Sequence, residues 1–273
     1  MKKLSFVTIA AAVLLAAVSC QKEETPVTMT ADQINDEIVV ENLFVELDGL
    51  ADEGVEWQLS PLKSGGVIGN YLNDECPAIT YDKESKPRKI VMDFGTGCVG
   101  KDGKTRSGKI IITSSAFENL MVERVKRFEN FVVDGKNVEG KITTKVTINR
   151  ELFSRLAIIA EDLKVTLEDN TTLMRKGILT REHLLGKLGN PADDETSTWG
   201  EVFTKRANGA TITKTIDKAT PLLFKMECKQ IVSGIAAFSN GEASWTIDYG
   251  SGECDNTATV TRNGETRTVK LRK

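Results

Sequence analysis

The chain has 273 residues, of which 40% are apolar, and its formal net charge at pH 7 is −3. A weakly acidic chain is poorly matched to a phosphate backbone, so we expect no nucleic-acid partner. The apolar content is sufficient to bury a core, and the length suits one large β domain or two smaller ones.

Residues 1–19 have the features of a signal peptide. Lys2 and Lys3 form a short basic region, and the apolar run from Leu4 to Val18 is shorter than the ~20 residues that a membrane-spanning helix needs. Removing this segment, which carries two lysines and no acidic residue, changes the net charge from −3 to −5. No second hydrophobic span follows in the sequence.

The run ends in Ala17-Val18-Ser19-Cys20, which resembles the lipobox of bacterial lipoproteins. The resemblance implies that Cys20 is acylated and becomes the mature N-terminus, with residues 20–29 as a lipidated tether. Each acyl methylene that enters the bilayer contributes ~0.8 kcal/mol, so the implied partner of this end is a membrane. The alternative for Cys20 is a buried thiol.

The next residues, Gln21-Lys22-Glu23-Glu24, resemble the surface-export signal of Bacteroidota lipoproteins. The resemblance implies that Lys22, Glu23 and Glu24 direct the protein to the outer face of the outer membrane. If these residues are only a solvated linker, the protein faces the periplasm instead.

Residues 30–273 are expected to form a β-rich domain that begins with one N-terminal helix, from Thr30 to Leu50. Thr30 and Gln33 form a capping-box pattern, Ile34 and Ile38 lie one turn apart, and acidic residues occupy the first turn. We expect this helix to pack on the sheet or to cover an edge, with its acidic residues in solvent rather than in a binding site.

A segment that begins at Met92 as MDFGTGC returns at Ile247 as IDYGSGEC. Each copy, near residues 76–113 and 228–271, enters a glycine-containing turn from a strand with one apolar face. The identical positions are Asp93, Gly95, Gly97, Cys98, Thr105, Arg106 and Gly108, which correspond to Asp248, Gly250, Gly252, Cys254, Thr261, Arg262 and Gly264.

The Asp-Phe-Gly triplet at Asp93 also occurs in protein kinases, but the other kinase motifs are missing from the sequence. The glycines suit a sharp turn of the chain. Asp93 and Asp248 are expected to accept hydrogen bonds from the amides of that turn. Their alternative role is that of calcium or sugar ligands.

Four cysteines remain besides Cys20, and four cysteines allow three connectivities. We favour Cys76 with Cys98 and Cys228 with Cys254, because each pair brackets one copy of the repeat and the compartment permits disulfides. No two of these cysteines have zinc-knuckle spacing, so we predict no metal site.

Dipeptides such as Asp-Gly and Asn-Gly punctuate the chain after Cys76 and suit two-residue hairpin turns. Alternating segments lie between them, for example Lys141 to Ile148, with its even-numbered residues on one face. The fold class is therefore mainly β, a long antiparallel meander of ten to thirteen strands in a curved sheet or a two-sheet sandwich. A subdivision near residues 189–200 is an alternative, although one continuous sheet avoids unpaired edges.

No catalytic constellation is apparent in the sequence. His183 is the only base available to a nucleophile, and a surface or packed role suits it better. Glycoside hydrolysis needs only two carboxylates, but no spacing singles out a pair. The stacking surfaces available for a glycan are Trp57, Trp199 and Trp245. Trp245 alternates with core residues and is expected to be buried, whereas Trp199, in a polar loop, is the least core-like.

The DFGTGC and GKTRSGKI segments, with the N-terminus, resemble a group of uncharacterised Bacteroidota lipoproteins, and this resemblance implies no activity. We expect a non-catalytic lipoprotein, without cofactor or metal, on the outer surface of the outer membrane. Its expected role is binding of a glycan or protein, adhesion, or envelope structure. The alternatives are a periplasm-facing carrier of an apolar ligand and a carbohydrate-active enzyme.

Overall fold

A computed structural model describes residues 43–44, 46–55, 71–73, 75–152, 154–184, 193–228 and 230–271. These residues form one helix and one antiparallel sheet, which confirms the predicted fold class. The sheet has fifteen strands, more than the ten to thirteen that the sequence predicted. The strands are β1 (Ala78–Asp82), β2 (Arg88–Asp93), β3 (Cys98–Val99), β4 (Thr105–Ser114), β5 (Met121–Val133), β6 (Lys136–Asn149), β7 (Ser154–Thr166), β8 (Thr172–Leu184), β9 (Glu195–Arg206), β10 (Thr211–Ile216), β11 (Leu222–Lys225), β12 (Gln230–Ser239), β13 (Ser244–Ser251), β14 (Thr257–Arg262) and β15 (Glu265–Lys270).

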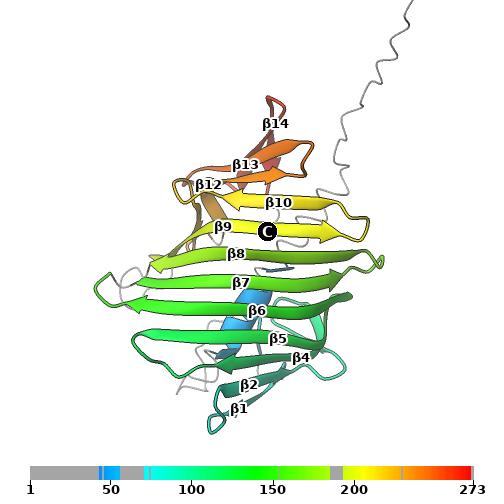
Figure 1. Ribbon diagram of the computed structural model, residues 1–273, viewed down its shortest axis with the longest axis vertical. Helices are drawn as coiled ribbons and strands as arrows, with labels where there is room; N and C mark the ends of the chain where they lie inside the picture. Colours follow the sequence, from blue (N-terminus) through cyan, green and yellow to red (C-terminus); the bar gives the residue numbers. More distant parts are fainter. Residues whose placement is uncertain are drawn as a thin grey trace, which may run out of the picture.

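The sheet is a meander in which nearly every strand pairs with its neighbours in sequence. The continuous path runs β1-β2-β4-β5-β6-β7-β8-β9-β10-β12-β13-β14-β15, while β3 adds to β4, and β11 lies between β9 and β12. Figure 1 shows the strands stacked in a single layer. The structure thus forms one sheet rather than a sandwich, and β8 and β9 pair directly on either side of residues 185–192.

The tight turns follow from the predicted dipeptides. Asp134 and Gly135 between β5 and β6, and Asn263 and Gly264 between β14 and β15, all have positive φ. That combination is the two-residue turn whose twist matches the strands that it joins. The register across both hairpins is therefore set locally.

The two faces of the sheet differ in burial. We call the face that carries Met92, Ile112, Ile142 and Leu163 the inner face; these side chains are buried. The opposite, outer face is mostly exposed, as the alternating pattern of β7 shows. Alternation of this kind is expected for an antiparallel sheet with one face on a core and the other in solvent.

The helix (43–55) covers part of the inner face, as the blue ribbon in Figure 1 shows. It was predicted over residues 30–50; residues 43–44 and 46–50 are helical, the helix continues to residue 55, and residues 30–42 lie outside the described part of the chain. The apolar residues on its buried side belong to the same core cluster as the inner face, and they are Leu43, Phe44, Leu47, Leu50, Ala51 and Val55. Burying each large side chain contributes roughly 1.5–3 kcal/mol.

Candidate ligand-binding face

Five of the residues that the sequence singled out lie outside the described part of the chain. They are the lipidation candidate Cys20, the export residues Lys22, Glu23 and Glu24, and Trp57. Their predicted roles therefore stay predictions.

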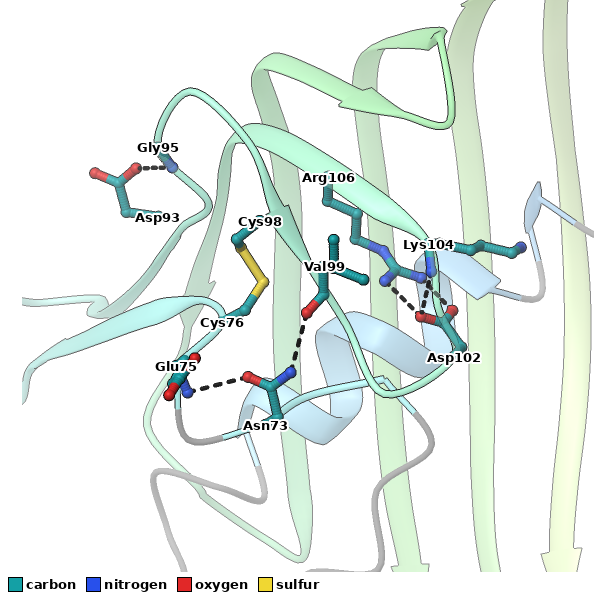
Figure 2. Close-up of a disulfide and its surroundings, with 10 residues drawn as sticks. All are labelled: Asn73, Glu75, Cys76, Asp93, Gly95, Cys98, Val99, Asp102, Lys104 and Arg106. Atoms are coloured by element: carbon teal, nitrogen blue, oxygen red, sulfur yellow. Dashed lines mark hydrogen bonds and ion pairs between the residues drawn. A yellow bond between two sulfur atoms is a disulfide. The ribbon is translucent and has the colours of Figure 1, made fainter.

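The predicted disulfide pairing is confirmed. Cys76 is joined to Cys98, and Cys228 is joined to Cys254, with Cα–Cα distances of 5.8 and 5.5 Å. Figure 2 shows the first bond, which ties Cys76, two residues before β1, to the short strand β3. Each bond closes the hairpin that leads into one glycine turn, β1-β2 in one copy and β12-β13 in the other.

Asp93 and Asp248 play the structural role that the repeat suggested. Asp93 Oδ1 accepts a hydrogen bond from the amide of Gly95 at 2.9 Å, and Asp248 Oδ1 accepts one from Gly250 at the same distance. The side-chain hydrogen bond from Lys109 and that from the Gly95 amide lower the pKa of Asp93. Among the described residues, no group of three or more His, Cys, Asp or Glu side chains could hold a metal ion.

The two repeat copies diverge after the cysteine. Arg106 lies in β4 opposite Cys98 and is buried, whereas Arg262 ends β14 opposite Trp245. Asp93 pairs with Lys109 across the sheet, and Asp248 pairs with Thr259. The shared Thr-Arg-x-Gly pattern therefore does not mark equivalent positions in space, because the chain returns to the sheet at different distances from the turn.

His183 is half-buried at the end of the β8-β9 ladder. Its Nδ1 lies 2.9 Å from Thr196 Oγ1, and its Nε2 lies 3.3 Å from Asp194 Oδ2. Burial, together with the nearby charge of Arg155, lowers the pKa of His183, so the ring is neutral at pH 7. These contacts make the histidine a link between neighbouring strands, in line with the packed role expected for it.

Both tryptophans in the described part of the chain pack against other residues of the fold. Trp245 is buried and stacks on Phe238, with ring centroids 5.4 Å apart, as its alternation predicted. Trp199 lies in β9 and not in a polar loop, because residues from Glu195 onward pair with β8. It is partly buried against the core, and Lys218 Nζ lies 5.4 Å from its ring centroid.

Two acidic residues of the predicted helix, Glu46 and Asp48, lie in the described part of the chain, and the prediction that they are in solvent is wrong. Glu46 and Asp48 are each 5% exposed, and both meet cations of the sheet. Arg106 Nη2 lies 2.5 Å from Glu46 Oε1, and Lys126 Nζ lies 2.5 Å from Asp48 Oδ1. The two carboxylates are buried because the helix packs over these cations, which lie in β4 and β5.

These ion pairs set the charge states of the buried groups. Burial alone would raise the pKa of Asp48, but Lys126 and Arg181 outweigh it and lower that pKa to about 2. Burial alone would lower the pKa of Lys126, but Asp48 and Asp52 outweigh it and raise that pKa. Both groups are therefore charged at neutral pH, and they fasten the helix to β5 and β8.

The outer face presents large apolar side chains to solvent over three neighbouring strands. Ile158 in β7 is 44% exposed, Ile178 in β8 is 59% exposed, and Phe203 in β9 is 43% exposed. Met174 in β8 and Leu156 in β7 extend the group. We call these five residues the apolar patch; the sequence did not reveal it, because its residues have the same period as core residues.

Beside the apolar patch lies a hollow of about 400 Å³. It is lined by Arg127, Glu139, Gly140, Lys141, Asp162, Leu163, Lys164 and Met174. A second cavity, of about 200 Å³, lies near the end of the helix at Val55 and Arg88 and is smaller than the 300 Å³ or more typical of small-molecule sites. The hollow therefore forms the candidate ligand-binding face together with the apolar patch.

Over the described ranges, no helix has the length and apolar character needed to cross a membrane. Comparison with known proteins found no matching protein family, no matching curated protein and no matching solved structure.

Proposed function

We propose that the protein is a lipoprotein, anchored in the outer membrane through Cys20, that binds an extracellular ligand on the outer face of its sheet without catalysing a reaction. The observation that carries this proposal is the apolar patch, which lies on the middle strands of the sheet and faces away from the helix. Exposed apolar groups that are contiguous and rimmed by polar residues mark interaction sites.

The charges on the inner face support a structural rather than a catalytic role for that side. Glu161 is paired with Arg175 at 2.7 Å, and Asp48 is held between Lys126 and Arg181. A carboxylate that is ion-paired in a packed core lacks the access to substrate that a general acid needs. The outer face is therefore the part of the described fold that is free to meet a ligand.

Cysteine labelling on intact cells tests the display of this face. Among the described residues all four cysteines are in disulfides, so Ile178→Cys adds one reactive thiol to the outer face. We expect a membrane-impermeant maleimide to label Ile178→Cys on intact cells. The matched control is Ile142→Cys, on the buried inner face, which should stay unlabelled until the protein is denatured.

Two further variants test the anchor and the export signal. Cys20→Ala should lose incorporation of a palmitate analogue, and replacing Lys22, Glu23 and Glu24 with alanine should abolish labelling of Ile178→Cys on intact cells. Labelling of Ile178→Cys that appears only after the outer membrane is permeabilised would show that the protein faces the periplasm.

A further inference from the structure

Charged residues on neighbouring strands follow a simple rule of opposite signs. Nine of the directly opposed pairs in the described sheet join an acidic residue to a lysine or arginine. They are Asp82–Lys89, Asp93–Lys109, Lys109–Glu129, Glu123–Lys145, Glu139–Lys164, Lys141–Asp162, Asp162–Lys176, Lys225–Glu195 and Arg262–Glu265. Such pairing stabilises a sheet.

Arg127 and Lys141 break the rule. They lie directly opposite each other on β5 and β6, both exposed on the outer face. Like charges in this position destabilise a sheet. Lys141 is also opposed by Asp162 on its other side, but the ion pair that Asp162 forms is with Lys176, at 3.4 Å. Among the described residues, neither Arg127 nor Lys141 has a carboxylate within ion-pair distance.

The same two cations line the hollow beside the apolar patch. The hollow lies where β5 and β6 change register: a bulge between Phe128 and Phe131 leaves Gly140 opposite Phe128, with a φ of +107°. A Cβ at Gly140 would lie 2.3 Å from the carbonyl oxygen of Asp162, so only glycine fits there. The unbalanced charge and the hollow therefore coincide.

We propose that this hollow binds an acidic saccharide, a sugar that carries a carboxylate. Arg127 and Lys141 would donate hydrogen bonds to the carboxylate, which supplies the missing negative charge. Glu139, Asp162 and Met174 also line the hollow. The two carboxylates would accept hydrogen bonds from sugar hydroxyls, and Met174 would offer an apolar surface to the C–H groups of the ring. This assignment rests on the proposed function, since it names the ligand class of the same face.

Binding of trigalacturonate, measured by calorimetry on the soluble chain from residue 21, tests the proposal, with maltotriose as the neutral probe and inorganic phosphate as the simple anion. We expect trigalacturonate to bind and maltotriose not to bind. Arg127→Gln and Lys141→Gln should each weaken binding about tenfold or more, because each removes a charged hydrogen bond. The matched control is Lys145→Gln, an exposed lysine on the same face of β6 that is opposed by Glu123, and its affinity should equal that of the native protein.

The proposal is overturned by no binding of trigalacturonate, by equal binding of maltotriose, or by equal weakening of binding in Lys145→Gln. Phosphate that binds as tightly as trigalacturonate would also overturn it, since the site would then recognise a bare anion. If trigalacturonate does not bind but Ile178→Cys is labelled on intact cells, only the assignment of the ligand class is wrong. If Ile178→Cys is not labelled on intact cells, the proposed function itself is wrong.

Discussion

The ammonium group of Lys126 in β5 lies 2.5 Å from the carboxylate of Asp48 in the helix, and both side chains are almost completely buried. Asp48 also accepts a hydrogen bond from Arg181 in β8 at 2.7 Å. One carboxylate thus joins the helix to two strands that are not neighbours. Buried charges are tolerated only with such partners, so this group should govern how the protein responds to acid and to mutation.

The low pKa of Asp48 predicts a loss of stability in acid. Its pKa is about 2 in the folded protein against an ordinary value of 3.8, so the folded state favours the ionised form. The contribution is therefore fully present above about pH 4 and is lost as the pH falls through 2, and it amounts to about 2 kcal/mol. Urea unfolding at pH 6 and pH 2 measures it, and Asp48→Asn, which cannot titrate, should lose less stability between these two pH values than the native protein.

Removing the buried cation should be costly. Lys126→Met leaves Asp52 without its cation and Asp48 with Arg181 alone, so we expect the free energy of unfolding to fall by about 3 kcal/mol. The matched control Lys145→Met removes an exposed lysine and should change that energy by less than ~0.5 kcal/mol. Equal effects of the two variants in urea unfolding would contradict a buried role for Lys126.

The like-charged pair on the outer face predicts a stabilising mutation. Arg127→Glu places an acidic residue opposite Lys141, and we expect it to raise the free energy of unfolding by roughly 0.2–1 kcal/mol. The reciprocal variant Glu123→Lys creates a new like-charged pair with Lys145 and should lower it by a similar amount. Both are measured by urea unfolding at low ionic strength, and the two effects should shrink together as salt is added.

The disulfides predict two similar losses of stability. Their sequence separations are 22 and 26 residues, so replacing both cysteines of either pair with serine should cost roughly 3 kcal/mol by the chain-entropy account. Mass spectrometry of a non-reduced digest first establishes the pairing, and urea unfolding then measures each loss. Crossed peptides that join Cys76 to Cys228 or Cys254 would contradict the structure.

The parts of the fold that the sequence predicted well depend on local signals. Asp134 and Gly135 direct a tight turn whatever the rest of the chain does, and such turns force neighbouring strands to be antiparallel. The repeat led to Cys76–Cys98 in the same way, because the two cysteines flank one hairpin. The hydrogen bond between Asp93 and Gly95 spans only two residues, so the sequence could predict it equally well.

The candidate site could not be predicted because it depends on distant residues. Ile158 stands beside Ile159, and Ile178 stands beside Leu179, so the sequence does not show which residue of each pair is exposed. Only the position of the helix on the opposite face decides it. Lys126 and Asp48 are 78 residues apart, so no sequence pattern connects them. The opposition of Arg127 and Lys141 likewise requires the register of β5 and β6, which the Asp134–Gly135 turn and the Phe128–Phe131 bulge set together.

The order of the strands bears on how the chain acquires its structure. Because nearly every strand pairs with the one before it, the sheet can grow by successive addition of hairpins, and contacts of this short range favour fast folding. The helix is different, since Asp48 meets Arg181, which lies 133 residues later in the chain. The helix leaves a ribosome or a translocation channel before the strands, yet it cannot complete its contacts until β8 has formed. The helix therefore completes its contacts only after the middle strands of the sheet are in place.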